Sequence, residues 1–355
     1  MAKIYKQCNY ETMIGGMGMT KKRLNLALQG GGSHGAFTWG VLDRLLEEKD
    51  LEITGVSGTS AGAVNGSALV YGLLTGGAEK AKEVLKSVWW ENSQMAQFSP
   101  FKQTWLDRLD NPGNIDHNML FAIGNLLTPL LSPYQCNPFN FNPMKNILNK
   151  VIDFSVIQQN DKVKLFLSAS NIRTSKVKVF PNNEITVDTV LASSCLPTVF
   201  QAVEIDGEHY WDGGYLGNPA MFPLFENTDC KDLLVIQIDS TDYRKLPTTP
   251  TDIMDRVTSM SFNSSLMREM RAIHFVNKIV DKGFDDGGNL QKINIHLIRP
   301  EETMSELNMS SKVNAAWDFL TYLRDCGRMK ADAWLQDNYA LVGKSSSCDI
   351  ETCFF

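Results

Sequence analysis

The sequence predicts an α/β fold with a mostly parallel central sheet, because a strand–turn–helix unit occurs twice near its start. Residues 24–29 alternate apolar and polar side chains and lead through a glycine-rich loop into a helical pattern. A short strand over 51–58 then leads into a small-residue helix over 61–74 that ends at Gly76-Gly77. Successive units of this kind are typical of parallel sheets with right-handed crossovers. Further strands are expected at 162–170, 177–180, 232–239 and 293–300.

The first predicted helix, over 36–48, is amphipathic. Phe37, Val41 and Leu45 recur at helical spacing, and charged side chains fill the opposite side. The amino terminus of this helix therefore lies at the glycine-rich loop.

Residues 203–214 form a predicted β-hairpin. Asp206-Gly207 suits a tight type I′ turn, and the returning strand ends at Asp212-Gly213-Gly214. The hairpin therefore delivers an aspartate to the end of a strand.

One domain is expected over 22–300, interrupted by a region of different composition. Residues 89–150 are rich in Asn, Pro and aromatic residues and show little periodicity, which indicates an inserted cap or lid. Outside the domain we expect a loose N-terminal leader over 1–21, a helical extension over 301–343 and a loose tail over 344–355.

Composition and charge limit the class of protein. The chain has 355 residues, of which 43% are hydrophobic and 21% charged, so it is globular with a sizeable core. A formal net charge of −6 argues against a general nucleic-acid binder. Seven cysteines without C-x-x-C spacing favour free thiols in a reducing compartment.

The sequence contains neither a recognisable signal peptide nor an apolar run long enough to cross a bilayer. The most apolar stretch, 119–134, is too short and contains Pro129. A cytoplasmic location is therefore expected, although export by a route without a cleavable signal stays open.

The glycine-rich loop over 30–35 (Gly-Gly-Gly-Ser-His-Gly) is suited to binding an anion with its backbone N–H groups. The anion could be the pyrophosphate of a dinucleotide, because the glycine spacing fits the G-x-G-x-x-G fingerprint. That site needs an acidic residue at the end of the second strand, whereas Asp50 and Glu52 precede or begin this strand. The anion could instead be an oxyanion formed during a reaction.

Directly after the second strand stands Gly58-Thr59-Ser60-Ala61-Gly62, a G-x-S-x-G pattern. Such a pattern places the serine hydroxyl at the tip of a sharp strand-to-helix turn. A cofactor site gives no reason for this serine, whereas acyl transfer needs both a nucleophile and donors for an oxyanion. We therefore favour acyl transfer, with a Rossmann-type dinucleotide-binding oxidoreductase as the alternative.

The serine also needs a proton acceptor, for which the sequence offers two candidates. One is Asp239 with His274 or His296, in the chain order of α/β-hydrolases. Both histidines lie inside predicted elements rather than at a strand end, which disfavours them. The other candidate is Asp212, whose carboxylate could approach the serine directly because two glycines follow it.

Taken together, these motifs resemble those of the patatin-like phospholipases in order and spacing. The residues concerned are Gly30, Gly31, Gly32, Ser33, His34, Gly35, Gly58, Ser60, Gly62, Asp212, Gly213 and Gly214. Residues 191–200 are similar to the Ala-Ser-x-x-x-Pro segment of this family. The resemblance covers roughly 22–300 and implies a three-layer α/β/α patatin-like fold with a cap.

The resemblance implies a lipid acyl hydrolase of the phospholipase A or lysophospholipase type. Ser60 would be the nucleophile and Asp212 the general base, with backbone amides around Gly31, Gly32 and Ser33 as the oxyanion hole. The reaction would pass through an acyl-enzyme and would need no metal or organic cofactor.

The implied partner is membrane phospholipid or another fatty-acyl ester, met through transient peripheral contact. Nucleic acid is not an expected partner, and the need for a protein activator stays open. The apolar residues of the cap would either line an acyl channel, contact the lipid surface or pack the cap onto the sheet; they are Phe98, Phe101, Trp105, Leu106, Leu109 and the stretch 119–134. Position 34 is often Lys or Arg in the family but is His here, which argues against a role for the loop in binding anionic headgroups.

Overall fold

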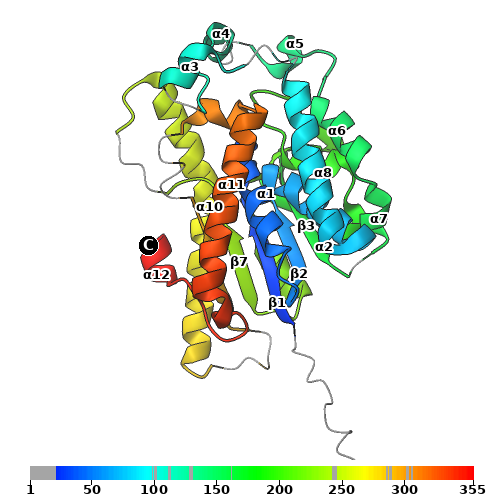
Figure 1. Cartoon of the computed structure of the whole chain (residues 1–355), viewed down its shortest axis with the longest axis vertical. Coiled ribbons are helices and arrows are strands. Elements are labelled where there is room, and N and C mark those ends of the chain that lie inside the picture. Colours follow the sequence, from blue (N-terminus) through cyan, green and yellow to red (C-terminus); the bar gives the residue numbers. More distant parts are fainter. Residues whose placement is uncertain are drawn as a thin grey trace, which may run out of the picture.

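The structure is a computed structural model of the chain (Figure 1). It describes residues 21–97, 99, 102–110, 113–127, 131–160, 162–241, 246–284, 287, 290–300, 304 and 307–355. The leader expected over 1–21 lies outside the described residues except for Lys21, as do Phe98, Phe101 and part of the stretch 119–134.

Within this description the centre of the molecule is an eight-stranded sheet in the order β5-β6-β3-β2-β1-β7-β8, with β4 paired to β3. The strands are β1 (Lys22–Leu28), β2 (Leu51–Gly58), β3 (Lys164–Asn171), β4 (Val177–Pro181), β5 (Val203–Ile205), β6 (Glu208–Asp212), β7 (Asp232–Ile236) and β8 (Asn294–Ile298). Five neighbouring strands of the sheet are parallel, namely β3, β2, β1, β7 and β8. The strands β4, β5 and β6 form antiparallel pairs. The mostly parallel sheet confirms the predicted fold class.

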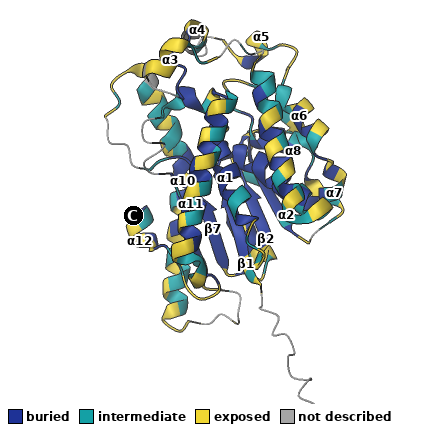
Figure 2. Ribbon diagram, viewed as in Figure 1, coloured by how far each residue is buried: buried dark blue, intermediate teal, exposed yellow. Residues whose placement is uncertain are grey.

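Helices cover both faces of the sheet. On one face lie α1 (Gly35–Leu45), α2 (Ala61–Ala96) and α11 (Trp317–Asn338), together with α6 (Pro143–Val151), α7 (Phe154–Gln158) and α8 (Val187–Ser193). On the other lie α9 (Phe222–Asn227), α10 (Pro250–Asp281) and α12 (Ile350–Phe354). Both faces of the central strands are therefore buried, as is usual for parallel sheets (Figure 2).

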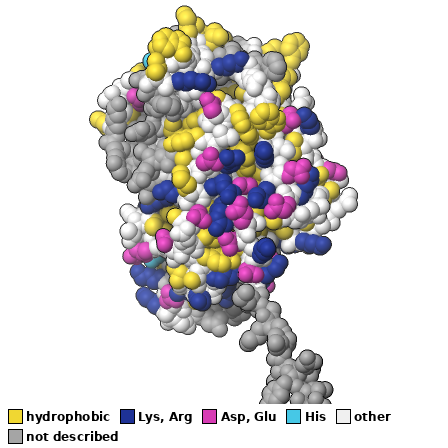
Figure 3. All heavy atoms as spheres, viewed as in Figure 1, with side chains coloured by type: hydrophobic (Ala, Val, Ile, Leu, Met, Phe, Trp, Pro, Cys, Tyr) yellow, Lys and Arg dark blue, Asp and Glu magenta, His cyan; other side chains and the backbone are white. Residues whose placement is uncertain are grey.

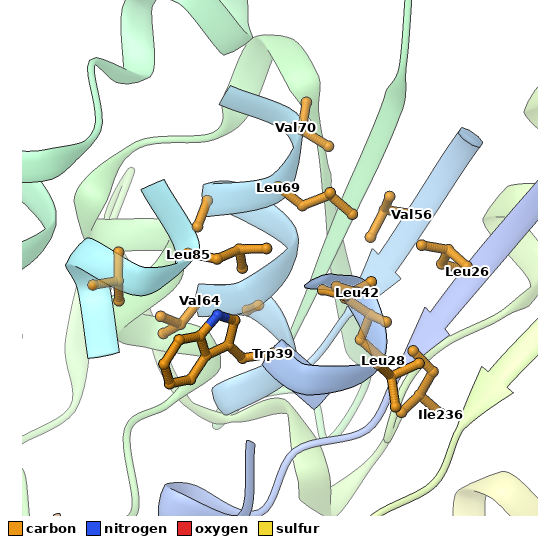
Figure 4. Close-up of a cluster of buried hydrophobic side chains, with 14 of the residues drawn as sticks. Leu26, Leu28, Trp39, Leu42, Val56, Val64, Leu69, Val70, Leu85 and Ile236 are labelled. Atoms are coloured by element: carbon orange, nitrogen blue, oxygen red, sulfur yellow. The ribbon is translucent and has the colours of Figure 1, made fainter. Parts of the chain in front are cut away.

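The two hydrophobic cores follow from the alternation of side chains along the strands. Leu26 and Leu28 of β1 face α1 and α2, whereas Ala27 between them faces the α9 and α10 side. Figure 4 shows the first core, in which Val56 of β2 and Ile236 of β7 join the β1 leucines beneath the helices. The described helices include none that is both long enough and apolar enough to span a membrane.

The predicted hairpin forms, and its turn has the expected geometry. Strands β5 and β6 pair around Asp206 and Gly207, whose φ values of 52° and 78° are those of a type I′ turn. The hairpin joins the sheet through β6, which pairs with β3 and places Asp212 opposite Ala169.

The cap is smaller than the sequence suggests. The helical geometry of α2 ends at Gly76-Gly77 as predicted, because both residues leave the helical region of φ and ψ, and a second helical segment then continues to Ala96. Trp89, expected to begin the cap, is buried in the core, and α6 packs on α2 and α8. The part that stands away from the sheet contains the short helices α3 (Trp105–Asp110), α4 (Met119–Leu127) and α5 (Pro133–Cys136) (Figure 1).

The C-terminal segments are part of the folded body, which corrects the expectation of a loose tail. Helix α11 packs closely on α1, since a Cβ at Gly327 would lie 2.1 Å from the Phe37 carbonyl oxygen. The tail expected to be loose over 344–355 forms α12, whose Ile350 and Phe354 are buried against α10 and β8. The sequence alone did not reveal this because apolar residues in a five-residue helix give too little periodicity.

We expect Phe354→Ala to destabilise the protein by about 3 kcal/mol, because it empties a buried aromatic site. Phe355→Ala is the matched control, since the side chain of Phe355 is 56% exposed and that of Phe354 6%. Chemical denaturation of both variants measures the difference. Equal stabilities of the two variants would contradict the packed tail.

Candidate active site

Ser60 occupies a strained turn between β2 and α2. Its φ of 55° and ψ of −122° are unfavourable for a residue with a side chain, as in a nucleophile elbow. The flanking glycines are required by close approach: a Cβ at Gly58 would lie 2.4 Å from the Gly62 carbonyl oxygen. A Cβ at Gly62 would lie 2.1 Å from the Leu28 carbonyl oxygen at the end of β1.

Hydrogen bonds to neighbouring segments hold this turn in place. The Ser193 hydroxyl accepts the Ser60 N–H at 3.0 Å and donates to the Ser168 carbonyl oxygen at 2.7 Å. The Thr59 hydroxyl lies 2.7 Å from the Gly217 carbonyl oxygen, to which it donates. Ser193 belongs to the segment 191–200 noted in the sequence, but its contact with Ser60 depends on tertiary packing.

The glycine-rich loop lies directly against this turn. A Cβ at Gly30 would be only 2.6 Å from the Ser60 Cβ and 2.8 Å from the Thr59 carbonyl oxygen, so only a glycine fits against the turn. The Gly30 N–H donates to Asn218 Oδ1 at 2.8 Å. Within the described chain, the N–H groups of Gly31, Gly32 and Ser33 have no hydrogen-bond acceptor. The loop therefore has three unengaged donors adjacent to the residue that contacts Ser60.

Asp212 is fully buried at the end of β6. Its Oδ1 accepts the Gly214 N–H at 2.7 Å, while its Oδ2 has no hydrogen-bond partner of normal geometry among the described residues. Burial raises the pKa of Asp212 to about 7, against a smaller lowering by the Gly214 N–H and the Ser60 hydroxyl. The Asp212 carboxyl group therefore titrates near neutral pH, and it lies close enough to the Ser60 hydroxyl for the hydroxyl to lower its pKa slightly.

The glycine after Asp212 allows this loop to reach the serine turn. A Cβ at Gly213 would lie 2.1 Å from the Ser168 carbonyl oxygen and 2.9 Å from the Thr59 side chain. The Asp212 N–H donates to the Cys195 carbonyl oxygen at 2.8 Å, which fixes the end of the strand. Loops after β1, β2 and β6 thus converge at one edge of the sheet.

A segment that no motif identified covers the glycine-rich loop. It is the 3₁₀ helix η4 (Met309–Val313), in which the Ser311 hydroxyl lies 2.7 Å from His34 Nε2. A Cβ at Gly32 would meet the Lys312 carbonyl oxygen at 2.4 Å. Burial, with a smaller contribution from Lys312, lowers the pKa of His34 to about 3. His34 is therefore a buried neutral residue that joins the loop to η4.

The histidines proposed for a Ser-Asp-His triad lie in other interactions. His296 Nε2 is 3.0 Å from Asp232 Oδ1, and His274 Nε2 is 3.1 Å from a Glu351 oxygen. Asp239 forms a 2.8 Å ion pair with Lys312. In the described part of the chain neither histidine contacts Ser60 or Asp239, so the structure does not assemble this alternative.

The sequence matches the profile of one protein family, Patatin-like phospholipase, over residues 26–224. This range is more than half of the 355-residue chain and contains all three motifs. The chain belongs to the patatin-like phospholipase family. Membership supports lipid acyl hydrolase activity and confirms the resemblance seen in the sequence.

Solved structures of similar proteins include two of low sequence identity. VipD from Legionella pneumophila is 16% identical, with 86% of this chain and 67% of that chain covered and a TM-score of 0.38. The type III effector protein ExoU is 14% identical, with 89% and 53% covered and a TM-score of 0.32. No curated protein matches the sequence significantly.

The alternative of a dinucleotide site lacks its acidic residue in the structure. Asp50 precedes β2 and Glu52 is the second residue of this strand, so both lie at the end opposite Ser60. A dinucleotide ribose would need an acidic residue at the carboxyl end of this strand.

No cluster of His, Cys, Asp or Glu among the described residues of this patatin-like phospholipase could hold a metal ion.

We expect Asp212→Asn to stabilise the protein at pH 8 and to have a smaller effect at pH 5. The pKa of Asp212 is about 7 in the folded protein, against 3.8 for an unperturbed aspartate, so wild-type stability falls as the pH rises from about 4 to about 7 and is constant above that range. Removing the buried charge should recover on the order of 3 kcal/mol at pH 8. Thermal unfolding at both pH values measures this, and an equal effect at pH 5 and pH 8 would contradict it.

Proposed function

We propose that the protein hydrolyses fatty-acyl esters of lipids, as a phospholipase A or lysophospholipase, through Ser60 and Asp212. The observation that carries the proposal is the combination of a strained serine with a buried carboxylate of raised pKa. A donor-rich backbone loop touches the same serine. A nucleophile, a base and donors for an oxyanion are the three parts that acyl transfer requires.

In the proposed mechanism the Ser60 Oγ attacks the acyl carbonyl carbon while Asp212 accepts the hydroxyl proton. The N–H groups of Gly31, Gly32 and Ser33 stabilise the oxyanion of the tetrahedral intermediate. When the intermediate collapses, the ester bond breaks and protonated Asp212 returns the proton to the leaving alcohol. Water then attacks the acyl-enzyme with Asp212 as base, which releases the fatty acid and restores Ser60.

The raised pKa of Asp212 suits this role. A general base is most effective when its pKa lies near the working pH, and burial brings that of Asp212 to about 7. Hydrolysis of a soluble ester should therefore increase with pH through about 7, because the carboxyl group must be ionised to accept the proton.

The cap offers a surface for peripheral contact with lipid. Hydrophobic side chains gather at the end of the molecule where α3, α4 and α5 lie (Figure 3). The most exposed of the described residues here are Trp105, Leu109, Met119 and Phe139. Exposed apolar patches of this kind mark interaction sites, and these residues extend from the end of the sheet that carries Ser60. We propose that this surface docks reversibly on phospholipid.

We expect a fluorophosphonate probe to label the protein on Ser60 alone. Ser60→Ala should abolish labelling and reduce ester hydrolysis by about three orders of magnitude or more, because no other group replaces the nucleophile. Intact-mass spectrometry and a p-nitrophenyl ester assay measure the two effects.

Ser67→Ala is the matched control for this experiment. Ser67 is a buried serine in α2, the helix that follows Ser60, and its hydroxyl has no partner among the described residues. The control should keep both labelling and activity. A labelled Ser60→Ala protein would refute the assignment.

Replacing Trp105, Leu109 and Phe139 together by Ser should reduce hydrolysis of vesicle phospholipid about tenfold or more, because docking depends on buried apolar area. Cleavage of a short soluble ester should survive, since the three side chains are exposed and Ser60 and Asp212 are left intact. Phe275→Ser is the control, because Phe275 is 63% exposed on α10 outside the cap. Equal losses on both substrates would refute the docking surface.

A further inference from the structure

Asn218 lies beside the candidate active site but belongs to none of the motifs that identified it. It follows Asp212-Gly213-Gly214 on a loop that packs on α10, where its own N–H donates to the Ser265 hydroxyl at 3.0 Å. Its side chain is fully buried, and its Oδ1 accepts the Gly30 N–H at 2.8 Å. The same Gly30 touches the Ser60 Cβ, so Asn218 supports the loop at its contact with the serine.

The other side-chain atom, Nδ2, is a buried donor without a partner in the described part of the chain. The orientation of the amide follows from Gly30, because only Oδ1 can accept the N–H. Leaving a buried donor unpaired is costly. An aspartate would keep the bond to Gly30 and carry no such donor, so hydrogen bonding alone does not explain why an amide stands here.

Charge explains the choice of an amide. The segment that carries Asn218 begins with Asp212, and its Gly217 carbonyl oxygen is bonded to Thr59, next to Ser60. A second carboxylate on this loop would repel the ionised form of Asp212 and the oxyanion of the intermediate. An asparagine gives the same acceptor to Gly30 with no charge.

We propose that Asn218 is a positioning residue: its neutral amide anchors Gly30 so that the N–H groups of Gly31, Gly32 and Ser33 stay unengaged beside Ser60. The inference rests on the proposed function and adds the group that orders the oxyanion loop. Asn218 acts through Gly30 and takes no part in bond making or breaking.

Two variants and one control test the inference, all assayed as full-length protein on a soluble p-nitrophenyl ester. Asn218→Ala removes the acceptor and should lower kcat about 100-fold with KM changed by less than about threefold, because the oxyanion donors lose their position. Asn218→Asp keeps the acceptor and should move the acidic limb of the kcat/KM profile up by about one pH unit, because a like charge raises the pKa of Asp212. Ser265→Ala removes a buried bond to the same residue without touching Gly30, and should lower thermal stability while keeping kcat.

Retention of wild-type kcat by a folded Asn218→Ala protein would overturn the inference, as would an unmoved acidic limb in Asn218→Asp. If Asn218→Ala does not fold, Asn218→Asp decides alone, because it retains the bond to Gly30. Fluorophosphonate labelling separates this inference from the proposed function. If the wild-type protein is labelled on Ser60 and Asn218→Ala keeps its kcat, only the role of Asn218 is refuted. If the wild-type protein is not labelled on Ser60, the proposed function itself is refuted.

Discussion

The candidate active site depends on loops that pack so closely that no side chain fits between them. The loop after β1 touches the serine turn at Gly30, and Gly62 of that turn meets the Leu28 carbonyl oxygen. The loop after β6 meets Ser168 of β3 in the same manner at Gly213. A Cβ at any of these three glycines would lie within 2.6 Å of another atom, so a larger residue would push the loops apart. Glycine is therefore needed at these positions so that the loops can pack against one another. This packing places Ser60, the Asp212 carboxylate and the N–H donors of the glycine-rich loop at the same edge of the sheet.

This packing also determines the electrostatics of the site. The loops exclude water from Asp212, which raises its pKa because a buried carboxylate loses hydration. The same burial leaves two polar atoms, Asp212 Oδ2 and Asn218 Nδ2, without partners among the described residues. Unsatisfied buried polar atoms lower the free energy of unfolding. Such atoms are found at functional sites, where a reactive arrangement is kept although it reduces stability.

The C-terminal part of the chain completes both the core and the surroundings of the site. Helix α11 packs on α1, and η4 holds the glycine-rich loop through the Ser311–His34 contact. The neighbouring Ser310 hydroxyl accepts the Ile115 N–H of the segment between α3 and α4 at 3.0 Å. One short 3₁₀ helix therefore links the glycine-rich loop to the cap, although the two are far apart in the sequence.

The sequence by itself determined the fold class and the candidate residues, because strand–turn–helix order and glycine-bounded motifs are local properties. It predicted the parallel sheet, the β5–β6 hairpin and the loops that carry Ser60 and Asp212. It did not predict the extent of α2, the packed tail or the burial of His34, since each depends on contacts with distant segments. The roles of Ser193, Ser311 and Asn218 were also invisible, because a single polar residue has no pattern. Only the tertiary structure decided that Asp239 pairs with Lys312 and that Asp212 is buried within reach of Ser60. The physical reason is that the surroundings of a carboxylate, and hence its pKa, are set by residues that folding brings together from distant parts of the chain.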